Sequence, residues 1–319
     1  MNLPNRTAIV VSAHRPYPTI ETCLRGFQSI VDRKEDLIFV NNGSSAPLLR
    51  LVSGMFPDIT LVNLSRNDLF CAGYNAGIRM ALDRNYDFVL IANADTEVVN
   101  PSFISELLAA AGRWPKAAFL GPLVYYRNRE SIQNTRLQFP SITHNVIHWI
   151  PWRLFPGIYD RVPVKEGGVG FLNGVCVLCR AAALREFGLM DEQYGGYVED
   201  ADWSWRARKS GWSSVFVPIP SIIHHEEREG YEHFSFKSFL LKRNTVLWYL
   251  KAGCRASALA YALASIGLVW IRILSAQNGS IREKHQRFLR DLTRCYRRMI
   301  LGSGLELSKP SEEWGLQIQ

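Results

Sequence analysis

The sequence predicts an α/β fold with a mostly parallel central sheet and a helical region at the C-terminal end. Short apolar segments rich in β-branched residues alternate with segments of helical spacing from Thr7 to Asp95. The apolar segments are nearly continuous, which is typical of parallel strands that are covered on both faces. The last third of the chain changes to long apolar and basic segments with helical spacing.

Four strands are expected in the first part of the chain, with helices between them. The strands cover residues 7–13, 36–42, 58–64 and 87–95. In open parallel sheets, ligands bind beyond the carboxyl ends of the strands. The loops selected by this rule are 13–16, 41–45, 65–68 and 93–97.

The composition is that of a globular protein with an anionic partner. With 319 residues, 47% of them apolar, the chain can bury a sizeable core in one large domain or two. The net charge of +8 is compatible with nucleic acid, a membrane surface or a phosphorylated small molecule. No helix-turn-helix, zinc-finger or RNA-binding signature is visible, so we expect no nucleic-acid partner. We also expect no signal peptide, because the start lacks a charged leader, an apolar core and a cleavage site in order.

Cys176 and Cys179 form a C-x-x-C motif, but it lies in an apolar segment that is typical of a buried strand. No second pair completes a zinc site, so we expect both to be core residues. The dinucleotide and P-loop glycine motifs are also absent, so phosphate binding must use other groups. Asn93 and Asp95 end the fourth expected strand, where oxygen ligands can hold Mg²⁺ or Mn²⁺. The alternative is an Asx turn or a helix N-cap, and these residues alone favour neither.

Four segments, in order, resemble family 2 glycosyltransferases of the GT-A fold, a Rossmann-like architecture. They are FVNNGSS (39–45), NDLFCAGYNAGI (67–78), VLIANADTEV (89–98) and the long stretch at 170–212. The chain is most similar to the bacterial rhamnosyltransferase-like enzymes of surface-polysaccharide assembly. The resemblance implies a nucleotide-sugar-binding and catalytic domain at residues 1–228 and a helical region at 229–319.

The family's Asp-x-Asp-like motif binds a divalent ion on the diphosphate of a nucleotide sugar. It corresponds here to Asn93, Ala94 and Asp95, which makes Asp95 the main ligand of Mg²⁺ or Mn²⁺. Asn93 would serve as a neutral oxygen ligand or contact the ribose or a metal-bound water. A histidine after a later strand completes the ligands in such enzymes. His224 fits best, and His225 stays open because alternation along a strand lets only one of them face inward.

The nucleobase position of the family corresponds to Asn41, where an aspartate is replaced by an amide that can donate and accept. The small residues after Asp68 would let a helix approach the sheet or the sugar closely, with ordinary helix packing as the alternative. The expected nucleotide-sugar site comprises Ala13, His14, Arg15, Asn41, Asn42, Arg66, Asn67, Gly73, Asn75, Asn93, Ala94, Asp95, Asn173 and Gly174.

Glu199 and Asp200 match the acidic pair of the family. The resemblance makes Asp200 the general base, which accepts the proton of the attacking hydroxyl, and Glu199 its orienting neighbour. The alternative is a solvated acidic helix N-terminus, favoured by the helix dipole. Asp202 and Arg206 are four residues apart and are expected to pair as a helix anchor.

The residues that contact the acceptor are the hardest to predict from the sequence. Trp203 and Tyr197 are candidates, although burial in the core is the favoured interpretation of Trp203. The segment Tyr125–Gly167 contributes Trp152 as a further candidate, together with Trp149, Arg153 and Tyr159. The alternative for this segment is a surface excursion that its own aromatic residues pack.

The C-terminal region has an uncharged run from Ala256 to Ile271, shorter than the roughly 20 residues that span a bilayer. A basic helical segment follows it. Apolar helices beside arginine-rich ones favour peripheral contact with an anionic membrane surface. The alternative is a soluble bundle that packs on the catalytic domain or makes a homodimer. We therefore expect a cytoplasmic enzyme at the inner face of the cytoplasmic membrane.

The resemblance implies a metal-dependent, inverting glycosyltransferase. The expected reaction moves a hexose or deoxyhexose, with rhamnose preferred, from a dTDP- or UDP-sugar to a hydroxyl of a cell-surface glycan or a lipid-linked oligosaccharide. UDP-galactose, UDP-glucose and GDP-mannose are alternative donors. The two Asp-to-Asn replacements, at Asn41 and Asn93, also leave open a catalytically silent sugar-nucleotide-binding scaffold.

Overall fold

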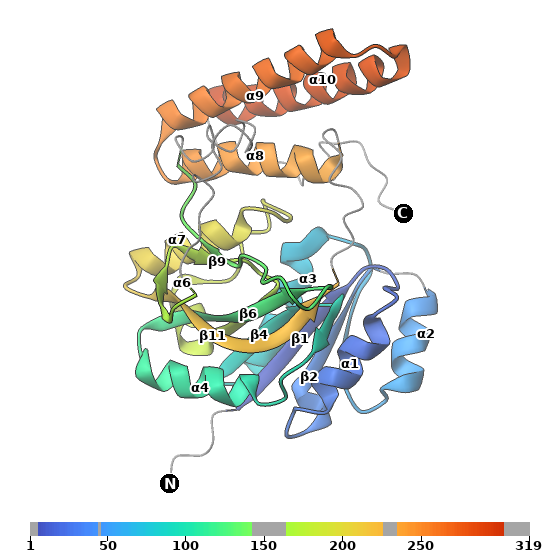
Figure 1. Ribbon diagram of the computed structural model, residues 1–319, viewed down its shortest axis with the longest axis vertical. Coiled ribbons are helices and arrows are strands. Elements are labelled where there is room, and N and C mark those ends of the chain that lie inside the picture. Colours follow the sequence, from blue (N-terminus) through green and yellow to red (C-terminus); the bar gives the residue numbers. More distant parts are fainter. Residues whose placement is uncertain (1–5, 44–45, 142–163, 226–234, 303–319) are drawn as a thin grey trace. The chain divides into compact units, whose positions relative to one another are not determined.

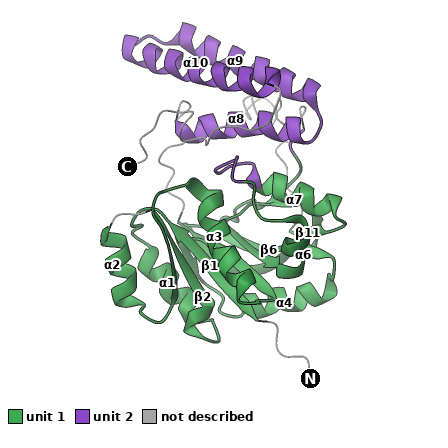
Figure 2. Cartoon of the chain, turned by 180° about the vertical axis from the view of Figure 1, so that it is seen from behind, with its two compact units in different colours: residues 1–139, 162–191, 200–227 green, residues 140–161, 192–199, 228–319 purple. Residues whose placement is uncertain are grey.

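The computed structural model describes residues 6–43, 46–141, 164–225 and 235–302. The chain divides into two compact units, coloured separately in Figure 2. Unit 1 comprises residues 1–139, 162–191 and 200–227, and unit 2 comprises residues 140–161, 192–199 and 228–319. Residues 192–199 thus belong to unit 2, although they lie within the stretch expected to form the catalytic domain.

Unit 1 is built on a sheet of nine strands (Figure 1). Four parallel strands run in the order β3-β2-β1-β4, and the sheet continues through β10, β6, β11 and β5, with β8 paired to β11. Strand β10 is antiparallel to both β4 and β6, so the sheet is mixed at its centre. The strands are β1 (Thr7–Ala13), β2 (Leu37–Asn42), β3 (Thr60–Leu64), β4 (Phe88–Asn93), β5 (Thr96–Val98), β6 (Ala117–Tyr126), β8 (Gly167–Val169), β10 (Cys176–Arg180) and β11 (Ser213–His224), and a separate pair is formed by β7 (Arg136–Leu137) and β9 (Phe171–Leu172).

The helices of this part of the chain bury one face each against the sheet or its loops. Helix α1, for example, buries Ile20, Cys23, Leu24 and Phe27, the spacing of an amphipathic helix. The elements are α1 (Ile20–Gln28), the 3₁₀ helix η1 (Lys34–Asp36), α2 (Ala46–Met55), α3 (Leu69–Asp83), α4 (Phe103–Arg113), α6 (Ala181–Phe187) and α7 (Glu199–Lys209). The predicted α/β fold is confirmed, with a mixed sheet in which β1 to β4 are parallel and β10, β5 and β8 pair antiparallel with their neighbours.

Helix α3 packs unusually close to β1 and β2. A Cβ atom at Gly77 would lie 2.4 Å from the side chain of Val10, and one at Gly73 would lie 2.5 Å from the hydroxyl of Ser12. Gly73 therefore serves helix packing, the alternative to sugar contact that the sequence left open. Cys176 and Cys179 are both buried in β10, where burial raises the pKa of each thiol.

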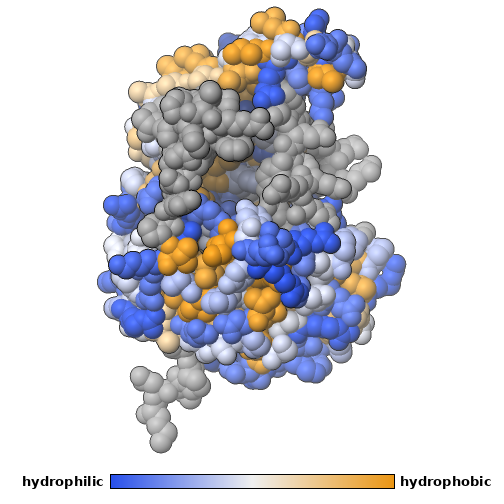
Figure 3. All heavy atoms as spheres, in the orientation of Figure 1, coloured by the Kyte–Doolittle hydropathy of each residue, from blue (hydrophilic) through white to orange (hydrophobic). Residues whose placement is uncertain are grey.

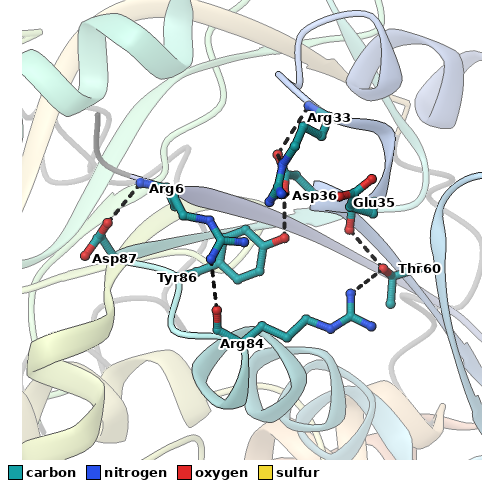
Figure 4. A network of polar contacts seen from close by, with 8 residues as sticks. All are labelled: Arg6, Arg33, Glu35, Asp36, Thr60, Arg84, Tyr86 and Asp87. Carbon is teal, nitrogen blue, oxygen red and sulfur yellow. Dashed lines mark hydrogen bonds and ion pairs between the residues drawn. The ribbon is translucent and has the colours of Figure 1, made fainter. Parts of the chain in front are cut away.

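A polar network ties together the amino ends of β1 to β4 (Figure 4). The backbone N–H of Arg6 donates to Asp87 at 2.9 Å, and Arg84 donates to the hydroxyl of Thr60 at 2.8 Å. Tyr86 donates to Asp36 at 2.6 Å. At the amino ends of these strands the polar side chains bond to one another. The candidate functional residues lie at the carboxyl ends.

Unit 2 contains the helices α8 (Phe236–Lys251), α9 (Arg255–Ser275) and α10 (Gly279–Leu301), which pack against one another. The face that α9 buries comprises Ala258, Tyr261, Ala262, Ser265, Val269 and Ile273. Among the described residues, α9 is the one helix long and apolar enough to cross a membrane, with a mean hydropathy of 1.7, and 33% of its most apolar window is buried.

Candidate active site

The site lies at the carboxyl ends of β1 and β4, where the strand order switches direction. The chain proceeds from β1 to β2 and β3 on one side and returns to β4 on the other side of β1. Strand β4 ends at Asn93, and the turn through Asp95 leads into β5. Because β5 pairs antiparallel with β11, His224 is placed opposite Thr96 and beside Asp95.

Asp95 and His224 form a pair of metal-ligand types at the carboxyl end of β4. The Nε2 atom of His224 lies 3.3 Å from a carboxylate oxygen of Asp95, and both side chains are largely buried. The Nδ1 atom lies 2.9 Å from the amide oxygen of Gln133. In the tautomer with its proton on Nδ1, the ring donates to this oxygen, and Nε2 offers a lone pair to a cation beside the carboxylate.

The neighbouring histidine points elsewhere. The Nε2 atom of His225 lies 3.0 Å from Glu97, which also accepts a bond from Arg129 at 2.8 Å. The alternation that the sequence predicts along the strand therefore separates the two rings, and His224 is the one that faces Asp95.

The charge state of Asp95 follows from His224. Burial acts to raise the pKa of Asp95, but the hydrogen bond and the charge of His224 outweigh it, so the pKa is lowered. Asp95 is therefore an anion at neutral pH. This is the state that a divalent cation requires.

Asn93 lies next to this pair, with its amide turned in a defined direction. Its Nδ2 lies 3.4 Å from Nε2 of His224, and its Oδ1 lies 3.3 Å from the hydroxyl of Tyr74. The amide oxygen thus faces Tyr74, and the amide must turn over before this oxygen can reach a cation held by Asp95. The backbone oxygen of Asn93 accepts from Thr96 at 2.7 Å, which fixes the turn.

The donor set fits a cation that shares its coordination with a substrate. Within the described ranges, no group of three His, Cys, Asp or Glu side chains surrounds a common point. One carboxylate, one imidazole nitrogen and an adjacent amide leave several positions for phosphate oxygens, as Mg²⁺ and Mn²⁺ prefer. The residues present therefore fit a cation bound together with a diphosphate.

Asp200, on α7, is related to the end of β4 through the loop before β10. Its carboxyl group accepts a hydrogen bond of 2.8 Å from the backbone N–H of Ala201, and the backbone N–H of Gly174 lies near enough to act on its pKa. The carbonyl of the next loop residue, Val175, accepts from the N–H of Asn93 at 2.9 Å. Removal from water raises the pKa of Asp200 to about 7, although the backbone N–H groups act in the opposite direction. A carboxyl group with such a pKa can accept a proton at neutral pH.

The expected nucleobase contact, Asn41, lies buried at the end of β2 and its amide donates to the side chain of Asn63 on β3. Asn42 is also buried, and it donates to the carbonyl of Leu69 at 2.8 Å. Asn67 accepts from the N–H of Leu69 at 2.9 Å. These amides shape the loop in front of α3, where Leu69 has a positive φ of 70°.

The charged candidates at this edge are exposed. Arg66 pairs with Asp68 at 2.9 Å while 65% of its side chain stays accessible. His14 and Arg15 follow β1 directly and are exposed, whereas Ala13 is buried within the strand. These side chains are accessible to an anionic ligand at the strand ends.

Two predicted binding residues have structural contacts. Both ends of the buried Asn75 amide bind the backbone of Met190, at 2.9 and 3.1 Å. Trp203 is 3% exposed and donates to the carbonyl of Gly188 at 2.9 Å, in agreement with the favoured core interpretation. We therefore assign both residues to the support of the loop that precedes α7.

The Asp202–Arg206 pair also supports the loop that precedes α7. The two side chains bond at 2.8 Å, and Arg206 also donates to the carbonyls of Phe187 and Leu189 at 2.9 and 2.7 Å. Glu199 is buried at the first position of α7, and Asn173 accepts from the N–H of Val175 at 3.2 Å.

Of the expected acceptor contacts, Tyr197 is partly exposed with a positive φ of 67°. Trp149, Trp152, Arg153 and Tyr159 lie outside the described residues. Two residues that the sequence interpretation missed are Gln133, which binds the ring of His224, and Tyr74, which binds the end of β4. No local pattern marks Gln133, since its partner lies 91 residues away.

Known proteins share this architecture. The mannosyltransferase PcManGT of Pyrobaculum calidifontis, solved with GDP-Man and Mn²⁺, has a TM-score of 0.54 and 13% identity, covering 94% of this chain and 88% of that one. S. aureus TarS has a TM-score of 0.50 and 12% identity, covering 97% of this chain, and this chain spans 47% of the TarS chain. At these identities the likeness shows the fold alone.

Two other proteins have a higher sequence identity to this chain than these solved structures. The chain is 31% identical over 235 residues to the N-acetylglucosaminyl-diphospho-decaprenol L-rhamnosyltransferase of Mycobacterium tuberculosis, which covers 68% of this chain and 75% of that protein. It is 25% identical over 212 residues to the low-salt glycan biosynthesis hexosyltransferase Agl10 of Haloferax volcanii, covering 65% of this chain and 64% of that protein.

The sheet order is that of the GT-A fold, the architecture shared with the solved glycosyltransferases. The model of the glycosyltransferase-like family 2 matches residues 4–244, about three quarters of the sequence. The chain belongs to this family, and the resemblance recognised in the sequence is confirmed.

Proposed function

We propose that the chain is an inverting, metal-dependent rhamnosyltransferase that uses a dTDP- or UDP-sugar and a lipid-linked glycan acceptor. The observation that carries the proposal is the connection of Asp200 to the end of β4 through Gly174 and Val175. It supports a site in which the carboxyl group of Asp200, with its raised pKa, acts beside Asp95 and His224. The named activity of the mycobacterial relative supports rhamnose as the sugar and a lipid-linked acceptor.

The chemistry of transfer assigns a separate task to each group. Asp95 and His224 would hold a divalent cation, which when bound stabilises negative charge on the departing diphosphate. Asp200 accepts the proton of the acceptor hydroxyl while its oxygen forms a bond to the anomeric carbon. The bond from that carbon to the diphosphate oxygen breaks, and the nucleoside diphosphate leaves with the electron pair. Attack on the face opposite the leaving group inverts the anomeric configuration.

The residues expected to contact the nucleotide do not determine which base the donor carries. Asn41 offers an amide that is already bonded to Asn63, and an amide can both donate to and accept from a pyrimidine. Arg66 and Arg15 supply exposed positive charge beside the strand ends, which suits an anionic nucleotide. These contacts support a nucleoside diphosphate in general, so dTDP-rhamnose is chosen on the likeness to the relative.

The C-terminal helices support contact with an anionic membrane surface, where a lipid-linked acceptor would be found. Hydrophobic side chains gather over the α9–α10 pair (Figure 3). The exposed apolar residues of α9 are Leu259, Leu263, Trp270, Ile271 and Leu274. The exposed basic residues of α10 are Arg282, Lys284, Arg287, Arg290, Arg294, Arg297 and Arg298. Exposed leucine and tryptophan with nearby arginine is the composition that binds the interface plane of anionic bilayers.

A donor panel tests the proposal. The purified chain is incubated with Mn²⁺, a polyprenyl-diphosphate-linked acceptor and dTDP-rhamnose, UDP-glucose, UDP-galactose or GDP-mannose, and products are detected by mass spectrometry. We expect a mass gain of one deoxyhexose with dTDP-rhamnose alone. Transfer from another donor would replace the sugar in the proposal, and nucleotide binding without any transfer would favour the scaffold alternative.

A further inference from the structure

The chain enters α7 through a tightly wound loop at residues 193–198. Three of its residues, Gly195, Tyr197 and Val198, have positive φ angles of 70°, 67° and 71°. Non-glycine residues rarely adopt this conformation, and it persists only where surrounding contacts hold it. Asp200 follows two positions after Val198.

Two adjacent residues of α8 hold this loop by its carbonyl groups. The amide nitrogen of Asn244 donates to the carbonyls of Tyr194, Gly196 and Tyr197 at 2.8, 2.7 and 2.8 Å. Arg243 donates to the carbonyl of Gln193 at 2.8 Å. Both Arg243 and Asn244 are completely buried.

Arg243 also decides which way the Asn244 amide faces. Its Nη1 donates to the amide oxygen of Asn244 at 2.7 Å. The oxygen is therefore bound by the guanidinium, and the NH₂ group faces the loop carbonyls. With two hydrogens for three carbonyls, at least one hydrogen is shared, so the three carbonyls converge on one point.

The loop and α8 belong to the same unit, and the peptide that follows Glu199 carries the chain into unit 1. Glu199 is the last residue of the segment held by α8, and Asp200 is bonded covalently to it. The contacts of residues 193–197 with α8 thus fix the course of the backbone shortly before Asp200.

We propose that Asn244, oriented by Arg243, is a positioning residue for the general base Asp200. This inference rests on the proposed function, because it assigns Asn244 a role in the step that Asp200 carries out. Loss of the contacts with the carbonyls (the carbonyl clamp) lets the loop leave its left-handed conformation and frees the backbone immediately before Asp200.

Asn244→Asp tests the clamp directly. This change keeps the size of the side chain and the oxygen that faces Arg243, but it replaces the NH₂ donor by an oxygen that repels the carbonyls. Ser265→Ala is the matched control, because Ser265 is a completely buried polar residue of α9 that bonds within the same unit, to Ala262 at 2.9 Å. Asn244→Ser, which keeps a shorter donor, serves if the aspartate variant does not fold.

Two measurements separate positioning from stability. Nucleoside diphosphate and Mn²⁺ are titrated calorimetrically to give the donor-side affinity and the fraction of competent molecules, and kcat is expressed per competent molecule. We expect Asn244→Asp to lose about 100-fold in kcat, the scale of a small misplacement of a reacting group, with nucleotide affinity within about twofold of the wild type. Ser265→Ala is expected to keep its kcat per competent molecule.

Hydrogen exchange of the peptide covering residues 193–203 gives a readout that needs no activity. Faster exchange in Asn244→Asp than in Ser265→Ala supports the clamp, and equal exchange overturns it. Equal kcat per competent molecule in the two variants also overturns the positioning role. If the wild-type chain transfers no sugar, the proposed function and the catalytic part of this inference both fail, while the exchange measurement still decides whether the clamp exists.

Discussion

Asp200 and Asn93 lie beside two successive residues of one loop. The carbonyl of Val175 accepts from the N–H of Asn93 at 2.9 Å, and the N–H of the preceding residue, Gly174, lies near enough to the carboxyl of Asp200 to lower its pKa. The loop at residues 174–175 therefore lies between Asp200 and the carboxyl end of β4, whose turn carries Asp95, although Asp95 and Asp200 are 105 positions apart (200 − 95) in the sequence. The following predictions depend on this arrangement.

Asp200→Asn should abolish transfer without abolishing donor binding. The amide cannot take the proton of the acceptor, so we expect kcat to fall by about 10²- to 10⁴-fold, while nucleoside diphosphate and Mn²⁺ bind as before. Steady-state kinetics and calorimetric titration measure the two effects. Asp58→Asn, in an exposed ion pair with Lys34 (N···O 2.7 Å), is the control. A scaffold protein would show no turnover to lose.

The pH profile should report the raised pKa of Asp200. A general base must be deprotonated to act, so kcat/KM is expected to rise with pH and to level off above a midpoint close to the pKa of about 7. The measurement is kcat/KM between pH 5 and 9 with a saturating cation. A midpoint near the ordinary carboxyl value of 3.8 would contradict the assignment.

Asp200 should also destabilise the ligand-free protein at alkaline pH. The folded pKa of about 7 is above the ordinary value of 3.8, so the folded state binds the proton more tightly. The destabilisation is absent below the unfolded pKa, grows as pH rises, and is complete above the folded pKa. Asp200→Asn, which carries no charge, should therefore raise the free energy of unfolding at pH 8 by on the order of 4 kcal/mol at most. Urea unfolding of both proteins at pH 5 and pH 8 measures it, and a gain that does not grow with pH would refute the sign.

His224→Ala should weaken cation-dependent nucleotide binding. Removal of a ring that faces Asp95 at 3.3 Å is expected to raise the Mn²⁺ concentration needed for half-maximal activity by at least about tenfold. His225→Ala is the control, since that ring binds Glu97 instead. Activity is titrated with Mn²⁺ after treatment with a chelator, which should itself remove activity reversibly. Equal effects of the two alanine variants would exclude His224 from the site.

The exposed apolar face of α9 should determine vesicle binding. Leu263 and Ile271 are 61% and 63% exposed, and a double change to glutamate introduces charges that anionic lipid repels. Co-sedimentation with vesicles that contain phosphatidylglycerol is expected to fall at least about tenfold. Leu61→Glu, at a 40% exposed leucine of β3, is the control. Retained binding together with a change from dimer to monomer in solution would show that this face is a subunit contact instead.

Local sequence patterns predicted most strands of the sheet. Strand β1 has the predicted limits, Thr7–Ala13, while β3 and β4 begin slightly later than expected. At β4 the reason is that Asp87 lies outside the strand, where its side chain binds the N–H of Arg6. Near-continuous apolar runs are readable because burial on both faces leaves no alternation.

The sequence by itself determined the class of fold, the acidic end of β4 and the acidic start of α7, because these are carried by residues close together in the chain. Only the tertiary structure decided that His224 and not His225 faces Asp95, that Gln133 contacts this ring, and that Asn75 binds the backbone of Met190. The same holds for the clamp by Asn244, whose partners lie about 50 residues earlier. The physical reason is that a hydrogen bond depends on distance and direction in space, and a short stretch of sequence specifies neither for residues so far apart.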